Sequence, residues 1–214
     1  MANLIIKPTS GGNLILQDEG GDAALTVSTT GNTTLAGTSN NLGTIASATN
    51  FPAGHILQVV QTVKQDTFSS TSTSETLITG YNISITPTKA SSKILVNYSF
   101  DTSTSTSITA YAYMQRKIGS ADWAHLAGIQ GATHGGTSLP ALSHGGGENA
   151  WEMQKRAGMY LDSPSYTLTD AIQYRIGIRN ENSSATCYVG RTSRDNSLYH
   201  PRTASILICM EVAG

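Results

Sequence analysis

Charged residues are scarce in this sequence. Asp, Glu, Lys and Arg make up 13% of the 214 residues, about half of their usual share of roughly a quarter. The 13 basic and 14 acidic residues nearly cancel, whereas a protein that neutralises phosphates needs a basic surplus. Low charge combined with many Ile, Val, Leu and Tyr residues also excludes a disordered chain. We therefore expect a folded protein with no nucleic-acid partner.

Cysteines and long apolar segments are also lacking. The only cysteines are Cys187 and Cys209, and neither belongs to a CxxC pair. Two thiols are too few for a disulfide scaffold in a chain of this length, so we expect two small apolar residues in strands. No apolar run approaches the roughly 18 residues of a membrane helix, and the first residues do not resemble a signal peptide. No membrane insertion is expected.

Helical patterns are scarce, whereas strand patterns recur along the chain. The best helical candidate, residues 148–160, also alternates as a strand, and Gly158 disfavours the helix, so we predict a strand. Other strands are predicted at 56–63, 77–85, 93–100, 108–118, 173–179, 186–189 and 204–212. We expect Gly80 to break residues 77–85 into two strands, and Tyr111 and Tyr113 to face away from the apolar side of 108–118. Many short strands between turns are typical of an all-β sandwich or jelly roll.

The first 50 residues differ because they contain no aromatic residue and are interrupted by glycines. Short apolar segments recur about every ten residues, at 3–6, 13–16, 24–27 and 33–35. Such a segment is too small to bury a core alone, and no cysteine or histidine is present to brace it. Oligomerisation is the remaining way to bury a core, so we predict an intertwined β shaft in which several copies of the chain share one core. The pattern does not fix the number of copies. The alternative is a flexible Gly, Ser and Thr linker, which the regular Leu and Ile positions disfavour.

Three parts of the chain carry a family resemblance. They are the opening MANLIIKPTSGGNLILQDEGGDAALTVSTTGNTTLAG, the segment FPAGHILQVVQTVKQDTFSSTSTSETLITGYNISITPTKASSKILVNYSF, and the C-terminal LDSP and SILICMEVAG. In this order they resemble fibre-like structural proteins of tailed bacteriophages, especially phages of cyanobacteria and other aquatic bacteria. Residues 120–160 match nothing in that family. The resemblance implies a virion component, usually homotrimeric, with an N-terminal attachment shaft, a β-sandwich head and binding to the host surface, and it implies no enzyme.

No motif for catalysis is present. The sequence lacks HExxH, GxSxG, GxxxxGK[ST] and a GxGxxG that leads into a helix. A glycosidase needs two carboxyl groups a few ångströms apart, and nothing in the sequence pairs its acids in this way. Phage depolymerases are usually long β-helices, for which about 160 head residues are few. We predict no catalytic residues.

Three histidines lie in a Gly-rich stretch, at positions 125, 134 and 144. Their spacing matches no zinc motif. In a trimer, one histidine per chain can converge on the axis and form a three-imidazole metal site. The alternative, which we favour, is a set of hydrogen-bonded loop histidines, so no metal or cofactor is predicted.

The long loop over residues 128–149 is the first candidate ligand surface. Long Gly-rich loops in compact domains are usually functional or mobile. Trp123 and Trp151 flank the loop, and His134 and His144 lie within it. Aromatic rings beside polar loops suit saccharides, whose apolar faces stack on them. Core packing is the alternative for each tryptophan.

The segment RTSRDNSLYHPR, residues 191–202, is the second candidate ligand surface. Three arginines among twelve residues stand out in a chain with so little charge. Anions or glycans can be recognised by Arg191, Arg194, Tyr199 and Arg202. A hairpin loop with solvated charges is an equally weighted alternative.

These patterns together predict a homotrimeric all-β protein. Residues 1–53 form a short intertwined N-terminal β shaft that docks on another virion protein, and residues 54–214 form a jelly-roll-like antiparallel β-sandwich. Pro52 and Gly54 mark the boundary. We expect a phage fibre, located at the tail or capsid surface after assembly in the host cytoplasm, whose head loops bind host cell-surface polysaccharide through several weak sites. The alternatives are a non-adhesive virion protein (capsid decoration, head fibre or tail adaptor) and a glycan hydrolase.

Overall fold

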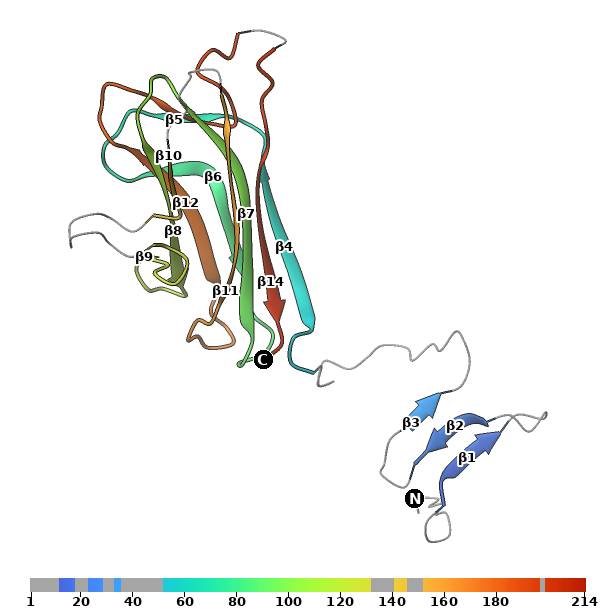
Figure 1. Ribbon diagram of the computed structural model, residues 1–214. Helices are drawn as coiled ribbons and strands as arrows, with labels where there is room; N and C mark the ends of the chain where they lie inside the picture. Colours follow the sequence, from blue (N-terminus) through green and yellow to red (C-terminus); the bar gives the residue numbers. More distant parts are fainter. Residues whose placement is uncertain are drawn as a thin grey trace. The chain divides into compact units, whose positions relative to one another are not determined.

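The computed structural model describes residues 12–17, 23–28, 33–35, 52–131, 141–145, 152–196 and 199–214. The chain divides into two compact units, Met1–Asn50 and Phe51–Gly214, which Figure 1 shows. Every regular element in the described part is a β-strand, and every strand pair is antiparallel. The all-β prediction is confirmed for these residues. No described element is a helix that is long and apolar enough to cross a membrane.

The N-terminal unit contains a three-stranded antiparallel sheet of β1 (Leu14–Gln17), β2 (Ala23–Val27) and β3 (Thr33–Leu35). The strands form where three of the four apolar segments of the repeat were predicted, and the fourth, residues 3–6, lies outside the described residues. Ile15 and Leu16 remain 45% and 50% exposed, so this small sheet leaves apolar side chains uncovered within one chain. The intertwined trimeric shaft stays a prediction.

The head, Phe51–Gly214, contains two antiparallel sheets. The first sheet consists, in spatial order, of β4 (Ile56–Lys64), β14 (Ser205–Val212), β7 (Lys93–Thr104) and β11 (Gln154–Asp162). The second sheet consists of β6 (Thr76–Ile85), β12 (Ile172–Asn180), β8 (Ala110–Ile118) and β10 (Ser143–Gly145). Three short strands extend these sheets: β13 (Cys187–Val189), β5 (Phe68–Ser70) and β9 (Ala124–His125).

The chain crosses between the two sheets in the order of a jelly roll. Strands β4, β7, β11 and β14 lie in the first sheet, β6, β8, β10 and β12 lie in the second, and β4 and β14 are neighbours. Successive main strands change sheet except from β8 to β10, and two packed sheets of four main strands in this order make a jelly roll. Figure 1 shows β4, β14, β7 and β11 side by side in one layer. The predicted β-sandwich is therefore confirmed, and so is the strand predicted within residues 148–160, which begins at Gln154.

The core lies between the two sheets and is built by alternate residues of each strand. On β7 the buried side chains are Ile94, Val96, Tyr98 and Phe100. On β12 they are Ile172, Tyr174, Ile176 and Ile178. Burial of one such aliphatic or aromatic side chain stabilises a fold by about 1.5–3 kcal/mol, so these rows supply much of the driving force for folding.

Both cysteines belong to this core. Cys187 and Cys209 are unpaired and fully buried, on β13 and β14. Burial raises the pKa of each thiol to about 12. They act as small apolar residues in strands, as predicted.

Asp162 links the two sheets through the core. Its carboxylate, on β11, accepts hydrogen bonds from Arg116 Nη1 on β8 at 2.7 and 2.8 Å and from the Tyr174 hydroxyl on β12 at 2.7 Å. Burial and the neighbouring Asp162 raise the pKa of Tyr174, so its phenol keeps the proton that it donates. Removal of one partner from such a buried pair typically costs about 3–5 kcal/mol.

Glu211 fixes the connection between β6 and β7 onto β14. Its side chain is fully buried. It accepts hydrogen bonds from Ser92 Oγ at 2.7 Å, Gln58 Nε2 at 2.7 Å, the Thr88 backbone N–H at 2.8 Å and the Lys89 backbone N–H at 3.1 Å. A carboxylate with this many donors is favoured in its charged form.

The Glu211 contacts predict an acid-sensitive fold. Burial by itself raises the pKa of Glu211, but hydrogen bonds from Ser92, Gln58 and Thr88 outweigh it, so the pKa lies below its ordinary value. A carboxyl with a lowered folded-state pKa stabilises the fold above the unfolded pKa of about 4.3, and this contribution is lost as the pH falls through the folded-state pKa. We expect Glu211→Gln to be less stable than the wild type near neutral pH and to lose less stability on acidification. Urea unfolding from about pH 3 to about pH 7 measures both effects, and equal pH dependence of the two proteins contradicts the prediction.

Candidate functional site

Strand β6 contains a bulge that the sequence did not predict. We expected two strands broken at Gly80, and this is wrong because β6 is one strand from Thr76 to Ile85. Asn82 pairs with Arg175 of β12, and Leu77 pairs with Gly177, so residues 78–81 lie opposite Ile176 alone. Gly80 takes a φ of +75° within this bulge, a left-handed conformation that costs glycine little.

A pocket of about 270 Å³ opens at this bulge. It is lined by Leu77, Ile78, Thr79, Gly80, Asn82, Trp123 and Arg175. The two largest lining groups are stacked, with the Arg175 guanidinium carbon 3.9 Å from the centre of a Trp123 ring. We call this cavity the bulge pocket. It is slightly smaller than the roughly 300 Å³ at which pockets for drug-sized ligands begin.

A chain of polar contacts holds Arg175 in place beside the bulge pocket. Arg175 Nε donates to Gln115 Oε1 at 2.8 Å, and Gln115 Nε2 donates to Glu75 Oε2 at 3.4 Å. The other carboxylate oxygen of Glu75 lies 2.9 Å from His125 Nε2. Arg175 lies on β12, Gln115 on β8 and His125 on β9, and Glu75 directly precedes β6. The guanidinium is therefore positioned by strands of the sheet rather than by a loop.

Tyr113 lies under the same network and is buried on the outer side of its sheet. Its side chain faces away from the apolar side of β8, as predicted, yet it is only 3% exposed. The ring packs across Gly177, where a Cβ atom would lie 2.2 Å from the Tyr113 hydroxyl oxygen, and 5.5 Å from the His125 ring. Burial, followed by the charge of Glu75, raises the pKa of Tyr113. The outer face therefore has a small packed layer of its own beside the bulge pocket.

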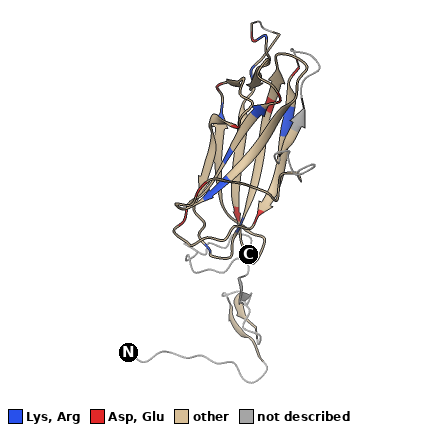
Figure 2. Cartoon of the chain, turned by 90° about the vertical axis from the view of Figure 1, so that its left-hand side faces the viewer, with Lys and Arg blue, Asp and Glu red and all other residues tan. Residues whose placement is uncertain are grey.

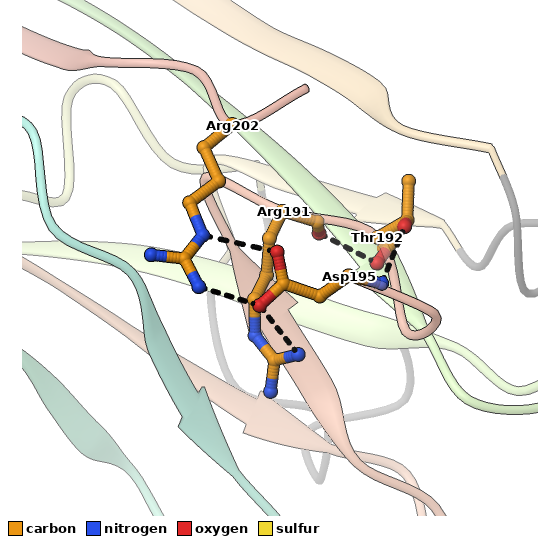
Figure 3. A network of polar contacts seen from close by, with 5 residues as sticks. Arg191, Thr192, Asp195 and Arg202 are labelled. Carbon is orange, nitrogen blue, oxygen red and sulfur yellow. Dashed lines mark hydrogen bonds and ion pairs between the residues drawn. The ribbon is translucent and has the colours of Figure 1, made fainter. Parts of the chain in front are cut away.

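The second predicted surface, residues 191–202, lies in the loop between β13 and β14, residues 190–204, which we call the arginine loop. Asp195 is its centre, with Arg202 Nε 3.0 Å from Oδ1 and Arg202 Nη2 2.8 Å from Oδ2. Arg191 Nη1 lies 3.4 Å from the same carboxylate, and its guanidinium stacks on Tyr188 at 4.2 Å. Figure 3 shows both arginines converging on Asp195. Asp195 itself has a φ of +37°.

These contacts reduce the positive charge that the arginine loop offers to a ligand. Hydrogen bonds from Arg202, followed by the charges of both arginines, hold the pKa of Asp195 below its ordinary value. The carboxylate is therefore charged near neutral pH and neutralises one of its two arginine partners. The sequence showed three arginines in this segment but gave no sign that Asp195 folds back between two of them.

The structure brings some predicted site residues together and separates others. Trp123 lines the bulge pocket, whereas Arg191 and Arg202 meet in the arginine loop with Arg194 and Tyr199 on the same segment. Tyr199 is 89% exposed. His144 lies on β10, but its side chain, His134 and Trp151 fall outside the described residues.

Sequence reasoning missed Arg175 and Asn82 of the bulge pocket. Both lie in strands that were predicted, but the pairing of β6 with β12 joins positions far apart in the sequence. The available signal was Gly80, because an isolated glycine inside a strand pattern often marks a bulge.

No protein-family model matches the chain, and no curated protein matches it either. Among solved structures, one of infectious bursal disease virus, Gx strain, is similar with a TM-score of 0.38 and 13% identity. The match covers 88% of this chain and 48% of that chain, so this chain spans about half the length of that relative. The jelly-roll assignment rests on the strand order and the core described above.

The bulge conformation makes Gly80 sensitive to substitution. A Cβ atom at Gly80 meets nothing within 4 Å, so backbone strain at φ +75° is the only cost of alanine. We expect Gly80→Ala to lower the free energy of unfolding by about 1 kcal/mol. Urea unfolding of this variant measures the loss, and Gly131→Ala, which also has open space but an ordinary φ, is the matched control. Equal stability of the two variants contradicts the bulge conformation.

Proposed function

We propose that the protein is a virion structural protein of a tailed bacteriophage, a homotrimeric fibre whose jelly-roll head adheres to a host-surface saccharide. The bulge pocket, with Trp123 stacked against Arg175, is the observation that carries this proposal. The saccharide site moves from the loops that the sequence indicated to the outer side of the second sheet.

The bulge pocket offers the groups that recognise a sugar ring. Arg175 covers one face of the half-buried Trp123 indole, and the C–H face of a saccharide would stack on the indole surface that Arg175 leaves uncovered. Arg175, Asn82 and Thr79 add guanidinium, amide and hydroxyl groups around it, and these pair with sugar hydroxyls or a carboxylate. An apolar platform with a few converging polar groups is the usual composition of a small-ligand site.

The arrangement supports binding rather than cleavage. The lining residues of the bulge pocket include no carboxylate, whereas a glycosidase acts through two of them. A single pocket of this size binds weakly, and adhesion then depends on several copies acting together. A trimer with an N-terminal attachment segment supplies that multivalency, and the sequence resemblance to phage fibre proteins points the same way.

A non-adhesive virion protein, such as a capsid decoration, a head fibre or a tail adaptor, is the competing function. It needs the same β head and attachment segment, but it makes no use of the bulge pocket. Saccharide binding by the purified protein therefore separates the two functions.

The proposal is tested on an array of bacterial surface saccharides with the full-length protein. We expect Trp123→Ala to weaken binding to any saccharide that the wild type retains by about tenfold or more, which is roughly 1.4 kcal/mol per site, because the stacking platform is lost. Release of reducing ends from the bound saccharide is measured in parallel, and none is expected.

Tyr199→Ala is the matched control, since it removes an exposed aromatic ring from the arginine loop. We expect it to bind as the wild type does. Loss of binding in Tyr199→Ala with binding intact in Trp123→Ala would move the site to the arginine loop. Absence of binding by the wild type to every saccharide on the array and to host cells favours the non-adhesive function. Asn82→Ala, an exposed polar substitution, repeats the test if Trp123→Ala unfolds.

A further inference from the structure

The middle of the outer face of the first sheet is uncharged and mainly apolar across all four main strands. Four of its side chains are among the most exposed large apolar groups of the described residues: Met159 at 64%, Val59 at 56%, Val63 at 47% and Leu161 at 43%. Figure 1 shows the strands that carry them, β4 and β11, at the two sides of β14 and β7. We call this surface the neutral face.

The strand register arranges the neutral face in three cross-strand rows. The first row consists of Val59, Met210, Leu95 and Leu161. The second row consists of Gln61, Ile208, Asn97 and Met159. The third row consists of Val63, Ile206, Ser99 and Ala157. Because alternate residues of a strand point to the same side, all three rows lie on the side opposite to the core.

Charged side chains border the neutral face only at its two ends. Lys93 follows the first row along β7, and an ion pair of Lys155 with Asp101, 3.0 Å long, follows the third row. The outer face of the second sheet is different, since Arg175 stacks on Trp123 and Arg179 stacks on Tyr111 at 4.7 Å. Figure 2 shows basic residues within strands of the head, seen from the side of β8 and β12.

We propose that the neutral face is the surface through which copies of this chain associate. This inference rests on the proposed trimer and names the part of the head that makes it. Exposed apolar surface of this extent on a folded domain usually marks a protein contact. The three rows contain no charged side chain with which a charged partner could pair. A second copy of the chain offers an equally neutral face.

The chemistry of the middle row fits a self-association. Gln61 and Asn97 flank Ile208 in this row, and a side-chain amide is both donor and acceptor. An amide of one copy therefore pairs with an amide of the next, while the apolar rows on either side exclude water. In a trimer the contact is heterologous, so the β4 side of one neutral face meets the β11 side of the next around the axis.

The area of the neutral face fits a contact that acts together with another. Four strands about 4.8 Å apart and three rows about 6.6 Å apart give a footprint of roughly 380 Å² per copy. Two copies then bury roughly 760 Å², which is less than a specific interface needs by itself. The contact is therefore weak alone and adds to whatever the N-terminal unit contributes.

The proposal is tested by thiol labelling of the full-length protein. Met159→Cys places a thiol on the neutral face, and Leu168→Cys places one at a 49% exposed apolar position outside it. The native cysteines are fully buried, so the introduced thiol is the one that reacts. At a concentration where sedimentation shows the oligomer, we expect Met159→Cys to react at least about tenfold more slowly than Leu168→Cys.

Addition of Val63→Lys to Met159→Cys gives the second arm, because a lysine in the third row repels its counterparts. We expect the thiol of Met159→Cys to become as reactive as that of Leu168→Cys. Leu168→Lys added to Met159→Cys is the control, and we expect it to leave the Met159→Cys thiol slow. Equal reactivity of the two single-cysteine proteins in the oligomer overturns the proposal. A monomeric chain at every concentration also overturns it, as does a Met159→Cys thiol that stays slow after dissociation. Loss of saccharide binding in Trp123→Ala leaves these rates unchanged. Equal reactivity of the two thiols within an oligomer overturns this proposal alone, whereas a monomeric chain overturns the proposed trimer as well.

Discussion

The bulge of β6 is the constraint on which much of the head depends. With Gly80 at φ +75°, residues 78–81 lie opposite Ile176 alone, and Tyr81 turns into the core. There its hydroxyl lies 2.8 Å from the Ile206 carbonyl oxygen and 3.2 Å from that of Ser99, so the second sheet is tied to the first. On the outer side the same bulge opens the pocket beside Trp123. This one bulge thus connects the packing of the sandwich with the bulge pocket on its outer side.

Two buried carboxylates form specific contacts between elements whose relative position apolar packing alone does not fix. Asp162 binds Arg116 and Tyr174 of the opposite sheet, and Glu211 collects donors from the β6–β7 connection. Apolar packing tolerates many alternatives of similar volume, whereas a buried charge is stable only where its donors are in place. In a chain with 13% charged residues, these two acids hold groups from separate strands and connections in place.

The elements of the head were largely predictable from sequence, but the sites were not. Alternation over residues 93–100 and 173–179 predicted β7 and β12 because one side of each strand faces the core. The sequence predicted the class, a sandwich or jelly roll, but not the order of the strands, because strand pairing joins residues that are far apart in the chain. Gly80 was taken for a strand end because a local pattern does not show that β12 pairs on both sides of it. Trp123 was identified by residue type, whereas its partner Arg175 is distant in the chain and became visible only through the sheet.

If the protein is a multivalent fibre, the two outer faces of its sandwich serve different contacts. The bulge pocket belongs to the second sheet, and the neutral face belongs to the first, with the core between them. If copies associate through their neutral faces, each second sheet is left turned away from the contact, so every bulge pocket stays open to solvent. Association and adhesion then do not compete for one surface, and the avidity of the assembly rises with the number of copies while each pocket remains a weak site.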